Sequence, residues 1–147
     1  KKLPVYGDGK NVRDWLFVED HAKAIDMVQE QGRLFETYNV GGHNEKQNIE
    51  IINIIIDTLQ EMLPADDPRR ALVSKDLITY VEDRKGHDRR YAIAPDKIKA
   101  EIGWYPETDF ATGIKKTIAW FFEHEDWMKN VTSGDYQEYY DSIYRNE

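Results

Sequence analysis

Cysteine is absent from the 147 residues, which excludes a disulfide framework and a thiolate nucleophile. No apolar run reaches transmembrane length, because Glu50 and Asn53 interrupt the longest one, IEIINIII. The N-terminus also lacks the charged and then apolar pattern of a signal peptide. We therefore expect a soluble, cytoplasmic protein.

Positive charge is scarce. The chain has 20 Lys and Arg against 28 Asp and Glu, which gives a formal net charge of -8. Nucleic acids and anionic membranes select basic surfaces, so we expect neither as a partner. An anion would have to bind in a local basic pocket.

Familiar catalytic and cofactor motifs are missing as well. Gly7 and Gly9 begin a G-x-G-x-x-G pattern, but Val12 stands at its third glycine. Tyr6 and Lys10 have Y-x-x-x-K spacing, yet that pairing needs a helix, and a glycine turn separates them. No two of the four histidines are three or four residues apart. We expect no catalytic, cofactor-binding or metal-ligating residue.

The sequence does contain alternating strand and helix patterns, which predict an α/β fold of one domain with few short strands and about five helices. We expect strands at 12–18, 35–42 and 77–84, with a second short strand possible at 90–95. We expect helices after an N-cap at Asp20 up to Gly32, over about 49–63 with Asn48 as N-cap, from Pro95 to 102, over about 110–123 with Asp109 or Thr108 as cap, and over 133–144. Ala24, Ile25 and Val28 are expected to face inward.

An anion site is the positive functional signal. The stretch DRKGHDRRYAI (83–93) is locally basic and follows a predicted strand. Arg13 follows a turn, and Asn48 opens a helix whose free N–H groups and dipole favour an anion. Guanidinium groups bind phosphate oxygens in pairs, so a diphosphate would suit this set. The alternative is structural: Arg84 pairs only with Asp83 or Asp88, and Asn48 only caps its helix.

Four stretches resemble the dTDP-glucose 4,6-dehydratase family of extended short-chain dehydrogenase/reductases. They are RDWLFVEDHAKAI, TYNVGGHNEKQN, ITYVEDRKGHDRRYAIAPDKIKAEIGWYP and FATGIKKTIAWF. RDW-x-x-VED is shared by many nucleotide-sugar enzymes, whereas GGHNEKQN and DRKGHDRRYA are more specific. The resemblance implies a Rossmann-type enzyme whose C-terminal, nucleotide-sugar-binding part corresponds to residues 1–147.

The resemblance also implies substrate-binding residues. Pro4, Val5 and Tyr6 match the segment beside the nucleoside, Arg13 the diphosphate-binding arginine, and Asn48 a substrate-contacting asparagine. Asp83, Arg84, Lys85, Gly86 and His87 match a D-R-P-G-H loop that contacts the diphosphate. Lys85 replaces the usual proline, which loosens the backbone restraint on this loop. Ala94 stands where an aspartate or serine usually caps the next helix.

The family's glycine motif, catalytic Tyr and Lys and acidic pair are expected upstream of Lys1. The resemblance therefore implies a lyase with bound NAD that acts on a dTDP-sugar in deoxysugar and dTDP-rhamnose biosynthesis. It implies a homodimer formed through the missing half, and an inactive fragment without bound cofactor. Two alternatives remain: the corresponding part of a UDP-sugar epimerase or decarboxylase, and a non-catalytic nucleotide-sugar-binding domain.

Overall fold

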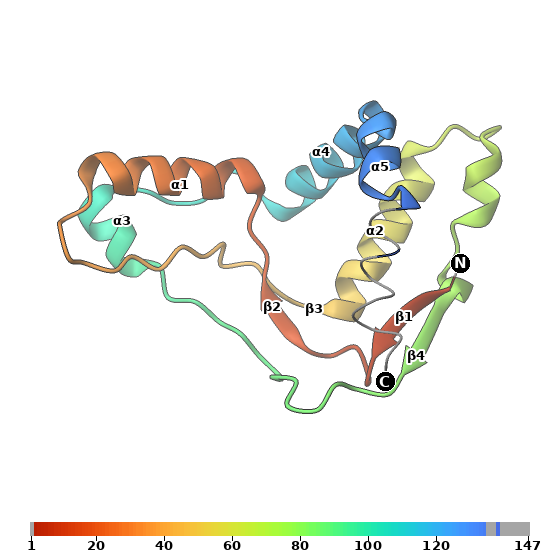
Figure 1. Ribbon diagram of the computed structural model, residues 1–147, viewed down its shortest axis with the longest axis horizontal. Helices are drawn as coiled ribbons and strands as arrows, with labels where there is room; N and C mark the ends of the chain where they lie inside the picture. The colour runs from red at the N-terminus through yellow and green to blue at the C-terminus, as the bar shows by residue number, and fades with distance from the viewer. Residues whose placement is uncertain (1, 135–137, 139–147) are drawn as a thin grey trace. The chain divides into compact units, whose positions relative to one another are not determined.

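The computed structural model describes residues 2–134 and 138, and it confirms an α/β fold with short strands and five α-helices in that part of the chain (Figure 1). The strands are β1 (Leu3–Tyr6), β2 (Val12–Asp14), β3 (Glu45–Gln47) and β4 (Ile78–Val81). The helices are α1 (Val18–Gln31), α2 (Asn48–Met62), α3 (Asp96–Ile102), α4 (Phe110–Glu123) and α5 (Glu125–Val131), with 3-10 turns at Pro68–Leu72 and Lys75–Leu77. The chain divides into two compact units, residues 1–114 and 115–147.

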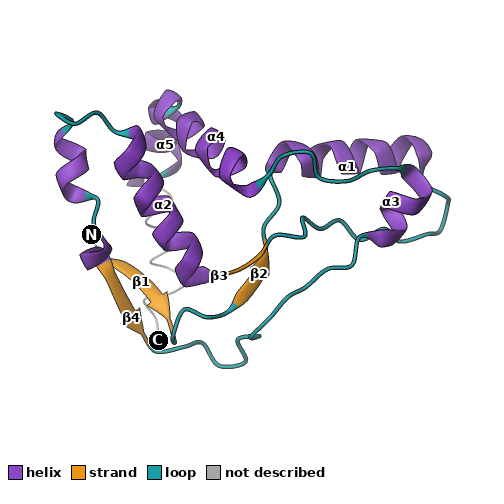
Figure 2. Cartoon of the chain, turned by 180° about the vertical axis from the view of Figure 1, so that it is seen from behind, coloured by secondary structure: helices purple, strands orange, loops and turns teal. Residues whose placement is uncertain are grey.

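Two small sheets organise the first unit. β1 and β4 run parallel, with Leu3 opposite Ile78 and Tyr6 opposite Val81 (Figures 1 and 2). β2 and β3 run antiparallel, with Val12 opposite Gln47. Parallel strands end at the same edge of a sheet, so the segments that follow β1 and β4 leave from one place.

The main buried cluster joins α1 to α3. Ala24, Ile98, Ile102 and Trp104 are buried together, and Tyr38 and Val40 pack against them. The Trp104 indole donates a 3.1 Å hydrogen bond from Nε1 to the Asp20 carbonyl, which satisfies the one polar group of this large side chain. This cluster fixes the two helices to each other.

The helix beginning at residue 18 corrects two expectations. Its cap residue is Phe17, and Asp20 lies inside the first turn. The carboxylate of Asp20 instead accepts a 2.9 Å hydrogen bond from the Thr108 backbone N–H, so a tertiary contact replaces the local cap. Ile25 does not face inward, because 58% of it is exposed. Gly32 does follow the last helical residue, as predicted.

The prediction of a strand at 12–18 was too long, because β2 ends at Asp14. The Asp14 side chain explains the turn that follows. Its two carboxylate oxygens accept 2.8 Å hydrogen bonds from the backbone N–H groups of Gly42 and Asn44. A charged acceptor with two backbone donors holds residues 42–44 against the end of β2.

The expected strand at 35–42 does not form a ladder within residues 2–134, and Figure 2 draws it as a loop. Its side chains nevertheless alternate, since Tyr38 and Val40 are half-buried whereas Thr37 and Asn39 are exposed. Its backbone lacks a neighbouring strand among the described residues, and a strand needs such a neighbour to satisfy its N–H and C=O groups. The prediction of a strand at 35–42 was therefore wrong for the described part of the chain, although the alternation of side chains on which it rested is present at residues 37–40.

The other helix predictions have mixed outcomes. α2 matches the predicted 49–63 closely, but its cap is Gln47 and not Asn48, and Pro95 is a cap and not the first residue of α3. Of the two predicted caps of α4, Asp109 is the one observed, with its carboxylate accepting from the Thr112 backbone N–H at 2.9 Å. Residues 90–95 contribute only a single bridge between Arg90 and Val12. The helix expected at 133–144 lies almost wholly outside the described residues.

Over residues 2–134, no helix has both the length and the apolar character of a membrane span.

Candidate functional site

The candidate site lies where β1 and β4 end. The Gly7 backbone N–H donates to the Val81 carbonyl at 2.9 Å, which extends the pairing by one residue. Segment 7–13 and loop 82–91 then leave the same edge of the sheet. Residues that are about 75 positions apart in the sequence are thereby placed together.

Hydrogen bonds dock the loop on segment 7–13. The Val12 N–H donates to the Arg89 carbonyl at 2.8 Å, and the Tyr91 N–H donates to the Val12 carbonyl at 3.0 Å. The buried Asn11 side chain donates from Nδ2 to the Asp88 carbonyl at 3.2 Å. These contacts carry Arg13, the next residue, to the loop.

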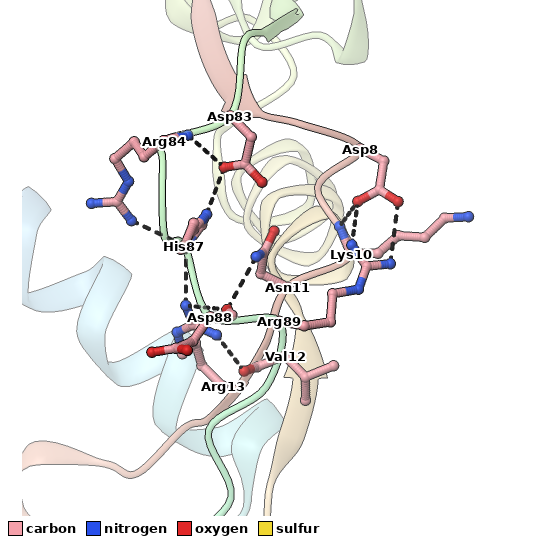
Figure 3. A network of polar contacts seen from close by, with 10 residues as sticks. All are labelled: Asp8, Lys10, Asn11, Val12, Arg13, Asp83, Arg84, His87, Asp88 and Arg89. Atoms are coloured by element: carbon pink, nitrogen blue, oxygen red, sulfur yellow. Dashed lines mark hydrogen bonds and ion pairs between the residues drawn. The ribbon is translucent and has the colours of Figure 1, made fainter.

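His87 is the centre of the resulting cluster (Figure 3). Its Nε2 lies 3.0 Å from Nη2 of Arg13 and 3.1 Å from Nη2 of Arg84. On the other side of the ring, Nδ1 lies 2.7 Å from Oδ1 of Asp83. Only 7% of the His87 side chain is exposed, so the ring is enclosed by these partners. The hydrogen bond from His87 lowers the pKa of Asp83 below its usual value.

Aromatic rings support both guanidinium groups. The Arg13 guanidinium lies 4.4 Å from the centre of the Tyr91 ring, and that of Arg84 lies 5.0 Å from the centre of the Tyr6 ring. Arg13 also donates to the Val12 carbonyl at 2.7 Å and to the Asp88 carbonyl at 3.1 Å. A cation over an aromatic face is attracted to it, so the rings restrict where the two arginines point.

The arginines of the loop fall into two groups by charge pairing. Arg89 forms a two-point ion pair with Asp8, at 2.7 and 3.2 Å, and Arg90 pairs with Glu45. Among residues 2–134, no carboxylate forms an ion pair with Arg13 or Arg84. The structural alternative, in which Arg84 pairs with an acid, therefore describes Arg89 and Arg90 instead. Arg13 and Arg84 therefore differ from Arg89 and Arg90 in having no carboxylate at ion-pair distance among the described residues.

The expectation of free N–H groups at the start of α2 was wrong. The Asn48 N–H donates to the Asn11 carbonyl at 3.0 Å, and the Ile49 N–H donates to the Gly9 carbonyl at 2.9 Å. The Glu50 carboxylate accepts from the Gln47 N–H at 2.7 Å, which places a negative charge at this end of the helix. Any contribution of Asn48 to an anion site has to come from its side chain.

The remaining predicted residues occupy different environments. Pro4 is exposed, whereas Val5 is 97% buried and belongs to the core. Lys85 and Gly86 form the exposed tip of the loop. Gly86 has φ +72°, a conformation that suits glycine, and a Cβ there would meet nothing within 4 Å. The structure thus brings Tyr6, Arg13 and residues 83, 84 and 87 together, and leaves Pro4 and Val5 outside that cluster.

Sequence reasoning missed two members of the site. Tyr91, under the Arg13 guanidinium, follows the basic residues directly, and an aromatic ring beside clustered arginines was a usable signal. Asn11 carried no signal, because its importance comes from burial and from its bond to the Asp88 carbonyl.

Metal and dinucleotide binding find no support among residues 2–134. No group of three or more His, Asp or Glu side chains there is arranged to hold a metal ion. The residues present do not fit NAD either, since Gly7 and Gly9 precede a strand, and the first amides of α2 are already occupied.

The relatives of the chain are nucleotide-sugar enzymes. A dTDP-glucose 4,6-dehydratase of Shigella flexneri is 49% identical over 144 residues, which is 98% of this chain and 38% of the relative. One from Neisseria meningitidis is 49% identical over 93% of this chain and 38% of its own length. The chain therefore spans a little over a third of the curated relatives that it matches, and its resemblance to dTDP-glucose 4,6-dehydratases is confirmed.

Solved structures agree with this. The dTDP-glucose 4,6-dehydratase of Bacillus anthracis in complex with NAD superposes with a TM-score of 0.72 at 47% identity, over 86% of this chain and 36% of that one. DesIV of Streptomyces venezuelae, a dTDP-glucose 4,6-dehydratase with NAD and TYD bound, gives a TM-score of 0.74 at 37% identity. The match covers 86% of this chain and 35% of DesIV. A UDP-glucose 4-epimerase of Thermotoga maritima shares the fold, with a TM-score of 0.69 at 23% identity. The match covers 84% of this chain and 35% of the epimerase. Residues 1–117 match the family model described as GDP-mannose 4,6 dehydratase, and the chain belongs to that family.

Proposed function

We propose that residues 1–147 are the C-terminal nucleotide-sugar-binding part of a dTDP-glucose 4,6-dehydratase, in which Arg13 and Arg84 bind the diphosphate. The observation that carries this proposal is that their guanidinium groups converge on one imidazole while neither pairs with a carboxylate of the described residues. Two unneutralised guanidinium groups match a diphosphate in charge and in donor geometry.

The other substrate-binding residues follow from this arrangement. Tyr6 and Asp83 border the arginine pair, and Lys85 and Gly86 are exposed in the same loop. Pro4 and Val5 lie on the strand that ends at Tyr6, and we assign this strand to the nucleoside end of the substrate. The Val5 side chain is buried, so Val5 would contribute through its backbone. Asn48 contributes its side chain amide.

The parent protein is proposed to carry an NAD-binding Rossmann domain before this segment. The backbone of residues 37–41 supports this, because its side chains alternate as in a strand while it forms no backbone–backbone hydrogen bond within the described residues. The exposed Leu34 and Phe35 support it too, since large apolar side chains usually lie against other protein. A homodimer would form through that missing part.

The whole protein would be a cytoplasmic lyase converting dTDP-glucose to dTDP-4-keto-6-deoxyglucose, a step towards deoxysugars such as dTDP-rhamnose. The chemistry belongs to residues outside this chain. The part described here would grip the diphosphate and so position the hexose, because binding energy far from the reacting atoms can be used for orientation. By itself the chain should not turn over substrate.

The gene upstream of Lys1 gives a direct test. A glycine-rich βαβ unit followed by a Y-x-x-x-K pair is expected there. If the coding sequence lacks both, the dehydratase assignment fails, and a non-catalytic nucleotide-sugar-binding domain replaces it.

Base selectivity tests the substrate. Thermal unfolding of the protein expressed from the complete gene should shift upward more with dTDP-glucose than with UDP-glucose at equal concentration, since a ligand that binds only the folded state stabilises it. Equal or greater stabilisation by UDP-glucose would instead favour a UDP-sugar epimerase or decarboxylase, whose shared fold is seen in the epimerase structure.

A further inference from the structure

We infer that His87 is a positioning residue: Asp83 holds its ring as the tautomer protonated on Nδ1, and the Nε2 lone pair gathers the guanidinium groups of Arg13 and Arg84 into one anion-binding pair. This inference deepens the proposed diphosphate site and rests on it. It assigns His87 an indirect role, in which the ring accepts from the arginines and does not donate to the anion.

The tautomer follows from donor and acceptor chemistry. A guanidinium group has only N–H donors and no lone pair to offer. Nε2 of His87 lies 3.0 and 3.1 Å from two such groups, so it must be the accepting nitrogen. The ring proton then resides on Nδ1, where it donates to Oδ1 of Asp83 at 2.7 Å. A carboxylate that fixes the tautomer of a histidine in this way recurs in catalytic triads.

The groups around the His87 ring favour a neutral imidazole that holds the two arginines in place. Arg13 approaches from β2 and Arg84 from the loop, while Tyr6 of β1 meets the ring edge-on with centroids 6.4 Å apart. With 7% of the side chain exposed, the ring has little surface through which to reach a ligand. An Nε2–H proton would point at two cations and break both contacts.

The contrast with the rest of the loop explains why an acceptor is needed. Arg89 is oriented by the Asp8 carboxylate and Arg90 by Glu45, but those carboxylates also cancel their charge. A neutral imidazole orients Arg13 and Arg84 without an ion pair, and the Asp83 carboxylate, which also interacts with Arg84, is bound to the other side of the ring. The site thereby keeps two ordered positive charges for an anion.

The first experiment measures the tautomer without any ligand. Long-range ¹H–¹⁵N correlation of histidine-labelled protein, expressed from the complete gene, reports which ring nitrogen carries the proton. The His87 signals are identified by their loss in His87→Gln. We expect a protonated Nδ1 and an unprotonated Nε2 at neutral pH. A protonated Nε2 would overturn the inference.

The second experiment compares two replacements of His87 by calorimetric titration with inorganic pyrophosphate and with dTDP. Gln can place its carbonyl oxygen near the position of Nε2, whereas Leu offers no acceptor. We expect His87→Leu to weaken binding of both probes by about tenfold, because each arginine loses a charge-assisted hydrogen bond, and His87→Gln to restore most of it. Equal losses in both variants would mean that the ring itself contacts the anion, which contradicts the inference.

Asp83→Asn provides a second route to the same question. An amide at position 83 can donate to Nδ1, which permits the opposite tautomer, with its proton on Nε2. We expect this variant to show a mixed or reversed tautomer and weaker pyrophosphate binding while unfolding at a similar temperature. An unchanged pyrophosphate affinity together with a reversed tautomer would refute the link between ring and arginines. Failure of the wild-type protein to bind either probe would refute the proposed function instead, whereas the tautomer measurement stands apart from it.

Discussion

Gly7 and Asp83 share one small space at the ends of β1 and β4. A Cβ added to Gly7 would lie 2.9 Å from Oδ2 of Asp83, and Gly7 has φ +57°. The absence of a side chain at position 7 therefore lets the Asp83 carboxylate reach His87. The left-handed backbone conformation favours glycine here, and a Cβ would also displace the Asp83 carboxylate.

Alanine at position 7 should therefore destabilise the protein more than alanine at Gly86. Gly86 has a similar φ, +72°, but its Cβ would meet nothing, so Gly86→Ala isolates the backbone cost of about 1–2 kcal/mol. Gly7→Ala adds the clash with Asp83. Urea unfolding of the two variants checks the order, and equal losses would show that the Asp83 side chain simply moves aside.

The Asp8–Arg89 ion pair should make stability depend on pH in acid. The hydrogen bond from Arg89 lowers the pKa of Asp8 from 3.8 to about 2. A lowered folded-state pKa means that the carboxylate stabilises the fold above about pH 4 and that this contribution is lost between pH 4 and pH 2. Asp8→Asn should therefore unfold more easily than the wild type at pH 6, and this difference should be much smaller at pH 2.

Denaturant unfolding at the two pH values measures this difference. Because the pair is exposed, 1 M salt should shrink it at pH 6. A difference as large at pH 2 as at pH 6 would assign the effect of Asp8→Asn to the neutral amide and not to the lost charge.

Ile98 and Ile25 offer a matched test of the core between α1 and α3. Ile98 is fully buried against Trp104 and Ala24, so Ile98→Ala should cost about 2–5 kcal/mol of unfolding free energy. The substitution Ile25→Ala removes the same atoms, but from a side chain that is 58% exposed. Alanine is also a better helix former than isoleucine. Ile25→Ala should thus change stability little, and a loss as large as that of Ile98→Ala would contradict the placement of α1.

Arg84 and Arg90 test the charge grouping of the loop. Arg84→Ala should weaken dTDP binding to the protein from the complete gene by roughly 1.5–3 kcal/mol, or about 10- to 150-fold, for a lost charge-assisted contact. Arg90→Ala removes the same charge but from a group already paired with Glu45, so its effect should be much smaller. An unchanged dTDP inhibition constant for Arg84→Ala would contradict the assigned role.

Local patterns in the sequence were sufficient for several elements. The spacing of isoleucines predicts α2 because a 3.6-residue period buries one face, and Asp109 predicts the start of α4 because its carboxylate can accept from backbone N–H groups three residues on. The basic stretch after β4 also predicts an anion site, which stays a prediction. Each of these depends on residues a few positions apart.

Tertiary structure decided the rest, because the deciding contacts join residues that are distant in sequence. The strand pattern of 35–42 forms no ladder, since pairing needs a neighbouring strand and not only alternation. The amides at the start of α2 are occupied by carbonyls of segment 9–11, which no helix pattern reveals. Four arginines of one chemical type separate into two that form ion pairs and two that contact an imidazole, because Asp8 and Glu45 lie beside one pair and His87 beside the other.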